Sequence, residues 1–129
     1  MDTEAGPPPT LQILIVEDTD TDYLLLERKV QKLLEPKACV RAANRRELVE
    51  FLLQPWDLII SDYHLQDIEG EALVTLIEQS HRHTPCILLS GSIDSLVTLN
   101  LPDNVFARIE KGNNVALRDA LLGVWPPSA

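Results

Sequence analysis

The sequence predicts an α/β protein with a doubly wound, five-stranded parallel sheet and helices on both faces. Short aliphatic runs alternate with segments of helical periodicity along the whole chain. The run 56–62 is too short for a helix, and its Leu-Ile-Ile centre suits a strand buried on both faces. Alternating strands and helices of this kind favour parallel pairing through right-handed crossovers. Only 5% of the residues are aromatic, so aliphatic side chains must fill the core.

Length and charge limit the classes of protein that fit. The 129 residues suffice for one domain, which we place at residues 11–125. The formal net charge of −9 would repel a phosphate backbone, so we expect no direct binding to nucleic acid. No apolar run approaches the roughly 20 residues that span a bilayer, and we expect no membrane insertion.

The two ends of the chain differ in composition from the domain between them. Residues 1–10 are acidic and rich in proline, which predicts a disordered lead without the features of a signal peptide. We therefore expect a cytoplasmic protein. Residues 126–129 form a tail, and Pro126-Pro127-Ser128 would suit the start of a linker if the chain is the first part of a longer protein.

Residues 11–36 hold the first strand and the first helix. The run 11–16 is aliphatic, and Thr19 or Asp20 can cap the helix that follows. Pro36 ends this helix. Its apolar residues recur at steps of three and four, which gives it one apolar face: Tyr23, Leu26, Val30 and Leu33.

The next segment contains a weak strand, a helix and the central strand. Residues 38–42 suit a strand toward an edge of the sheet, and Asn44 can cap the second helix. Pro55 ends that helix before the strand at 56–62. The inward-facing residues of the helix are Leu48, Phe51 and Leu52.

The second half of the chain repeats the alternation. Thr84-Pro85 separates a helix from a strand, and Gly112 precedes the last helix. In order, we expect a loop at 63–70, a helix carrying Leu73, Leu76 and Ile77, a strand at 86–89, a short helix at 93–99, a turn at 102–104, a strand at 105–109, and a helix carrying Leu117, Leu121 and Leu122.

Four of the predicted strands end in polar residues. These are Glu17-Asp18, Asp62, Ser90 and Lys111. The carboxyl ends of parallel strands form the ligand crevice of an open α/β sheet, so these side chains should converge. Any one of them alone could be a helix cap or a solvated loop residue.

Such a group of side chains suits phosphoryl chemistry. Three carboxylates repel one another unless a cation is present, and oxygen ligands favour Mg²⁺. An aspartate can act as a nucleophile and form an acyl phosphate. A lysine at the wall of the pocket is a point charge for an anion, and a serine hydroxyl can donate to a phosphoryl oxygen.

These motifs resemble those of the receiver domain of bacterial response regulators over about residues 11–125. The motifs are Ile15-Val16-Glu17-Asp18, the segment from Asp57 through Asp62 to Gly70, Leu88-Leu89-Ser90-Gly91, and Lys111. The resemblance implies a flavodoxin-like strand order, 2-1-3-4-5. It also implies a two-component phosphorelay in which Asp62 accepts a phosphoryl group from a histidine kinase or a phosphotransfer protein.

The resemblance assigns roles within the pocket. Glu17, Asp18, Asp62 and the backbone carbonyl of His64 would hold Mg²⁺. Ser90 and Lys111 would bind the phosphoryl oxygens, and Ser90 would shift toward them on activation. The chain would catalyse only its own phosphorylation and dephosphorylation, and would signal by binding an unknown downstream protein. The sequence leaves open whether the protein forms a homodimer.

Several positions depart from the family pattern. Gly112 follows Lys111 where proline is usual, so this peptide bond should be trans. Gln66 also replaces a common proline. Arg108 occupies the place of the aromatic switch residue, and Phe106, on the same strand face by alternation, could substitute for it. The side chains at two further positions would tune dephosphorylation: His64 and Ser92.

Two other functions remain open from the sequence. Arg108 and Gly112 keep open a receiver that binds its partner without phosphorylation. A haloacid-dehalogenase-like phosphatase would use Asp18 as nucleophile, since Asp18-Thr19-Asp20, Ser90 and Lys111 mimic its motifs. Against the phosphatase, Asp22 stands where that family prefers threonine or valine, the late acidic pair is missing, and Asp62 would have no role.

Overall fold

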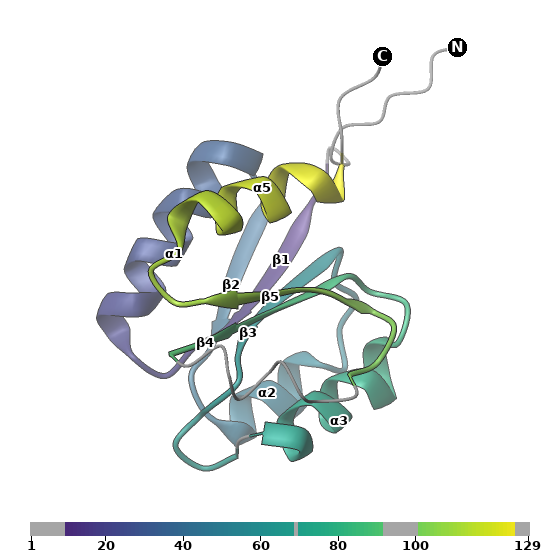
Figure 1. Ribbon diagram of the computed structural model, residues 1–129. Coiled ribbons are helices and arrows are strands. Elements are labelled where there is room, and N and C mark those ends of the chain that lie inside the picture. The colour runs from purple at the N-terminus through teal and green to yellow at the C-terminus, as the bar shows by residue number, and fades with distance from the viewer. Residues whose placement is uncertain (1–9, 69, 92–100, 126–129) are drawn as a thin grey trace.

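Five parallel strands form one sheet in the order β2-β1-β3-β4-β5. The computed structural model describes residues 10–68, 70–91 and 101–125 (Figure 1). The predicted fold class and strand order are both confirmed. The strands are β1 (Gln12–Val16), β2 (Ala38–Ala42), β3 (Leu58–Asp62), β4 (Cys86–Ser90) and β5 (Val105–Glu110).

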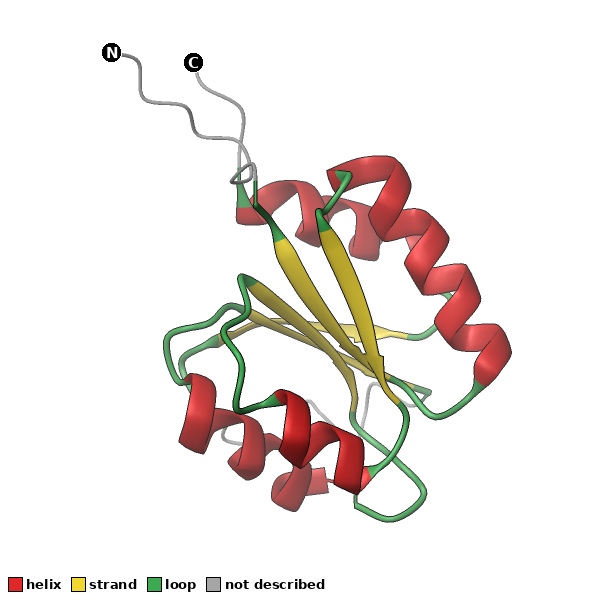
Figure 2. Cartoon of the chain, turned by 180° about the vertical axis from the view of Figure 1, so that it is seen from behind, coloured by secondary structure: helices red, strands yellow, loops and turns green. Residues whose placement is uncertain are grey.

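Helices cover both faces of the sheet. One face carries α1 (Asp20–Leu34) and α5 (Asn114–Val124), and the opposite face carries α2 (Arg45–Phe51) and α3 (Gly70–His81) (Figures 1 and 2). None of the helices in the described segments is long and apolar enough to cross a membrane. Residues 1–9, the short helix expected at 93–99, Ser92 and the tail at 126–129 lie outside the described residues.

The central strands β1, β3 and β4 are mainly aliphatic because each packs against both helical layers. In β1, Leu14 belongs to the core cluster under α2 and α3, whereas Ile13 and Ile15 belong to the cluster under α1 and α5. In β3, Ile59 and Ile60 are divided between the two clusters in the same way. All five residues of β3 are buried, as expected for the central strand of a parallel sheet.

The predicted N-terminal caps of α1 and α2 are confirmed in part. The side chain of Asn44 accepts a hydrogen bond from the backbone nitrogen of Glu47 at 2.9 Å, so the predicted cap of α2 is confirmed. Thr19 occupies the cap position of α1, but its side chain makes no capping hydrogen bond. Acidic residues in the first turn, Asp20 and Asp22, still favour this end of the helix electrostatically.

Two details of the strands differ from the predictions. β3 begins at Leu58 rather than at Trp56, whose indole nitrogen donates to the carbonyl of Phe51 at 2.8 Å and so ties this residue to the end of α2. The second difference lies in β5, where the pairing with β4 shifts register between Cys86 and Ile87.

The register shift changes the interpretation of Phe106. Cys86 pairs with Val105 and Ile87 pairs with Ala107, so Phe106 is an extra residue in the edge strand. Val105 and Ala107 consequently pack against different core clusters. The bulge interrupts the alternation between Val105 and Ala107, and both Phe106 and Arg108 are exposed.

The loop after β5 requires a glycine. Gly112 has a φ of +93°, in the region that side chains rarely adopt. Proline fixes φ near −65°, so the family's usual proline could not take this conformation. No cis peptide bond occurs among the described residues, which confirms the trans bond expected after Lys111.

Gly112→Ala is expected to lower the free energy of unfolding by about 1 kcal/mol, because a Cβ disfavours a positive φ. Nothing lies within 4 Å of the added Cβ, so the cost is conformational rather than steric. Urea denaturation would measure it. Gly123→Ala is the matched control: it also adds a Cβ into open space, but in helix α5 without a positive φ. An equal effect of both substitutions would contradict this account.

Candidate functional site

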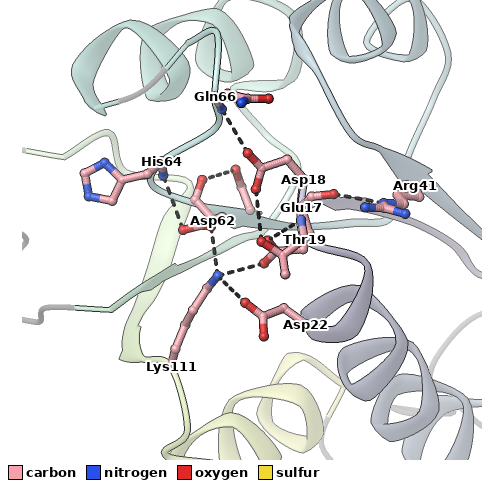
Figure 3. A network of polar contacts seen from close by, with 10 residues as sticks. Glu17, Asp18, Thr19, Asp22, Arg41, Asp62, His64, Gln66 and Lys111 are labelled. Atoms are coloured by element: carbon pink, nitrogen blue, oxygen red, sulfur yellow. Dashed lines mark hydrogen bonds and ion pairs between the residues drawn. The ribbon is translucent and has the colours of Figure 1, made fainter.

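The predicted polar residues meet at the carboxyl end of the sheet. Glu17 and Asp18 follow β1, Asp62 ends β3 and Lys111 follows β5 (Figure 3). Ser90 ends β4. The parallel pairing of Val16 with Ser61 brings the ends of β1 and β3 side by side. As a result, one carboxylate oxygen from each of three residues lies within 4.8 Å of the others: Glu17, Asp18 and Asp62.

Lys111 is the cation of this site. Its Nζ lies 3.0 Å from Oε1 of Glu17, and 2.9 Å from Oδ2 of both Asp22 and Asp62. Burial alone would lower the pKa of Lys111, but hydrogen bonds to Asp62, Asp22 and Glu17 outweigh it and hold the pKa above its ordinary value. Lys111 is therefore a fixed positive charge at neutral pH.

Asp62 is held by donors on both oxygens. Oδ1 accepts from the backbone nitrogen of His64 at 3.2 Å, and Oδ2 accepts from Lys111. The residue is only 6% exposed. These contacts fix the orientation of the carboxylate while leaving it at the edge of the sheet, where a ligand can reach it.

Glu17 is the most deeply buried of the three acids in the metal group, with 1% exposure. Burial raises the pKa of Glu17, although hydrogen bonds from Lys111 and from the backbone nitrogen of Thr19 act against this increase. The charge of Asp62 raises the pKa further. The charged form of Glu17 therefore destabilises the folded protein electrostatically, as expected for a carboxylate whose role is to bind a cation.

Glu17→Gln is expected to stabilise the magnesium-free protein at neutral pH and not at about pH 4. Because the folded state raises the pKa of Glu17, it binds that proton more tightly than the unfolded chain does. Wild-type stability is therefore lost as pH rises through the folded pKa, and the glutamine variant escapes this loss. Urea denaturation in EDTA at both pH values would measure it. A pH-independent difference would contradict it.

The loop after β3 is tied to Asp18. The backbone nitrogen of Gln66 donates to Oδ2 of Asp18 at 2.9 Å. The neighbouring Asp67 accepts from the backbone nitrogen of Arg45, the first residue of α2. Proline has no N–H to donate, so the departure from the family's proline at Gln66 makes this contact to Asp18 possible.

The remaining predicted residues occupy less central positions. Ser90 is fully buried, and its backbone oxygen accepts from the backbone nitrogen of Lys111 at 2.7 Å. The His64 ring points away from the carboxylates in Figure 3 and packs edge-on against Tyr63, with ring centres 5.0 Å apart. Phe106 is 45% exposed on the edge strand. The tuning and switching roles of His64, Phe106 and Arg108 stay predictions, and Ser92 is not described.

Sequence reasoning missed two residues that contact this site. Asp22 pairs with Lys111, and Arg41 donates from Nε to the carbonyl oxygen of Glu17 at 2.9 Å. Arg41 also pairs with Asp20 at 2.8 Å and lies 5.0 Å above the ring of Tyr23. One signal was available: the first turn of α1 starts at the same edge of the sheet as the pocket, so its acids should face any cation there.

The donor set fits Mg²⁺. Two oxygens on opposite sides of an Mg²⁺ ion are about 4.1 Å apart, because each Mg–O distance is about 2.05 Å. The 4.8 Å span of the three carboxylates is within a small side-chain adjustment of that separation. No sulfur or ring nitrogen takes part in this group, so it matches the oxygen ligands that magnesium prefers.

Comparisons with known proteins agree with this arrangement, although no family model matches the chain. The two-component response regulator ARR2 of Arabidopsis thaliana is 29% identical over 93 residues, which are 71% of this chain and 14% of that protein. The chain therefore spans a small part of its curated relative.

Solved structures share the fold. The response regulator TrrA from Thermotoga maritima, crystallised with Mg²⁺ and BeF, has a TM-score of 0.71 and 23% identity, with 88% of this chain and 98% of that chain covered. A signal receiver domain of an HD domain-containing protein from Pseudomonas fluorescens has a TM-score of 0.62 and 26% identity, with 88% and 96% covered. Fold and strand order together show that the chain has the fold of response-regulator receiver domains, and its sequence is similar to that of a response regulator.

Proposed function

We propose that this domain accepts a phosphoryl group on Asp62, with Mg²⁺, from the phosphohistidine of a histidine kinase or a phosphotransfer protein. The proposal is based on the surroundings of the Asp62 carboxylate. Its buried carboxylate is 2.9 Å from the ammonium of Lys111 and belongs to a group of three acids that can hold a metal.

The transfer would make one bond and break one. A carboxylate oxygen of Asp62 attacks the phosphorus, and an acyl phosphate forms. The P–N bond to the donor breaks, and the bonding pair leaves with the imidazole, which is neutral when its other nitrogen carries a proton. Hydrolysis by water would later return Asp62 as a carboxylate and release inorganic phosphate.

Residues around Asp62 would offset the charge of the transferring group. Glu17, Asp18, Asp62 and the backbone carbonyl of His64 would hold Mg²⁺, which would supply positive charge next to the phosphoryl oxygens. Lys111 would donate to one oxygen and the Ser90 hydroxyl to another. Asp18 is the weaker candidate for nucleophile, because the contacts found for its carboxylate come from Gln66 and Thr19 rather than from Lys111.

The downstream part of the proposal is a change in protein binding. Ser90 would move toward the phosphoryl group, and the surface around Phe106 and Arg108 would carry the change to a partner in the cytoplasm. His64 and Ser92 would set the lifetime of the acyl phosphate. Arg108 in place of an aromatic residue favours an output surface different from that of most relatives.

Intact-mass measurement after incubation with acetyl phosphate tests the proposal. We expect one phosphoryl adduct with Mg²⁺ present and none in EDTA. Phosphorylation that proceeds equally in EDTA would contradict the assigned role of the carboxylates. Continuous turnover of a phosphate ester, lost in Asp18→Asn and kept in Asp62→Asn, would instead favour the phosphatase. Equal partner affinity with and without phosphorylation would favour the phosphorylation-independent receiver.

A further inference from the structure

Lys111 has three carboxylate partners, and one of them belongs to neither the metal group nor the acceptor. Nζ lies 2.9–3.0 Å from Glu17, Asp22 and Asp62. A lysine ammonium has three hydrogens, so these contacts occupy all its donors. Asp22 comes from the first turn of α1, and its carboxylate reaches the ammonium from the side opposite Asp62 in Figure 3.

A phosphoryl group on Asp62 would need one of these three donors. Once Asp62 is an acyl phosphate, only two partners remain carboxylates, and their side chains are 1% exposed for Glu17 and 42% exposed for Asp22. A buried carboxylate without its counter-charge is strongly disfavoured, whereas an exposed one is solvated by water. Asp22 is therefore the carboxylate that Lys111 can leave at the lower cost.

We propose that Asp22 is a positioning residue that holds Lys111 in the unphosphorylated domain and competes with the phosphoryl group for its ammonium. The proposal rests on the function proposed above, since the competition exists only if Asp62 carries a phosphoryl group. On phosphorylation, Lys111 exchanges Asp22 for a phosphoryl oxygen, while its contact with Glu17 stays.

The sign of the effect follows from charge. Asp22 stabilises the unphosphorylated domain, in which Lys111 is free to pair with it. Its negative charge also repels a phosphoryl group that binds next to Lys111. Asp22→Asn keeps the size of the side chain and an acceptor oxygen but removes the charge. The variant should therefore bind a phosphoryl mimic more tightly than the wild type, whereas loss of a purely structural contact would weaken binding.

Equilibrium titration with beryllofluoride at saturating Mg²⁺, followed by calorimetry, tests this inference. Asp22→Asn is expected to bind roughly threefold to tenfold more tightly than the wild type, as for the loss of one charge-assisted contact at a partly exposed site. Asp22→Glu, which restores the charge, should return the affinity toward the wild-type value. Magnesium saturation is verified for each variant by titration of the metal alone.

Asp20→Asn is the matched control. It removes one negative charge from the same helical turn, but Asp20 pairs with Arg41 instead of Lys111 and its side chain is 87% exposed. We expect its affinity for beryllofluoride to stay within about twofold of the wild type, because Asp20 is solvent-exposed, is paired with Arg41 and makes no contact with Lys111 that could compete. A gain equal to that of Asp22→Asn would overturn the proposed competition and leave a general charge effect.

The failure of this inference can be separated from the failure of the proposed function. If the wild type and all variants bind no beryllofluoride while they bind Mg²⁺, phosphoryl acceptance on Asp62 is itself in error. If the wild type binds it and Asp22→Asn binds equally or more weakly, only the competition is wrong. Weaker binding would mean that Asp22 supports Lys111 in the phosphorylated state, and equal binding would mean that Asp22 does not affect it.

Discussion

Asp62→Asn is expected to abolish the phosphoryl adduct formed with acetyl phosphate and Mg²⁺, with a fall of at least about a hundredfold in phosphorylation rate. The amide lacks the negative oxygen that must attack phosphorus. Its oxygen can still accept a hydrogen bond, so the variant should remain folded. Intact mass over a time course gives the rate, and thermal unfolding checks the fold.

A second aspartate on the same strand segment supplies the control. Asp57 immediately precedes β3, so it lies at the amino end of the strand that Asp62 ends. Its carboxylate accepts a hydrogen bond from the backbone nitrogen of Gln12 at 2.8 Å. Asp57→Asn should leave phosphorylation at the wild-type rate. An adduct that persists in Asp62→Asn and disappears in Asp18→Asn would move the acceptor to Asp18 and would falsify the assignment of Asp62.

Much of the site could be predicted because it depends on strand order and strand ends. The aliphatic runs and their breaks at Pro36, Pro55 and Thr84-Pro85 define the strands, and parallel pairing then brings their carboxyl ends together. Glu17 and Asp62 consequently lie within 3.0 Å of the Lys111 ammonium, although Lys111 is separated from Asp62 by 49 positions.

The features that escaped prediction depend on packing between distant elements. The contact of Asp22 with Lys111 joins residues 89 positions apart and requires the relative placement of α1 and the loop after β5, which no local pattern encodes. The bulge at Phe106 is a second case. An edge strand has one partner, so a shift in register costs little and the alternation of side chains does not reveal it.

Lys111→Met is expected to lower the free energy of unfolding by about 2–4 kcal/mol in magnesium-free buffer at pH 7. The substitution keeps an apolar stem of similar length but leaves Glu17 and Asp62, which are 1% and 6% exposed, adjacent to each other without a counter-charge. Phosphorylation by acetyl phosphate should also fall, because no ammonium remains to stabilise the phosphoryl oxygens. Urea denaturation measures the first effect and intact mass the second.

Two conditions should restore the stability that Lys111→Met loses. Mg²⁺ supplies the missing positive charge, so the variant should gain more stability from saturating Mg²⁺ than the wild type does. Acidification should act in the same direction. Without Lys111 the folded-state pKa of Glu17 lies still further above its unfolded value, so the protein regains stability as pH falls through it. Lys32→Met, on the exposed surface of α1, should show neither response. If Lys111→Met and the wild type were equally stable in EDTA, water rather than Lys111 would be solvating the carboxylates. The Lys111 ammonium would then not stabilise the fold.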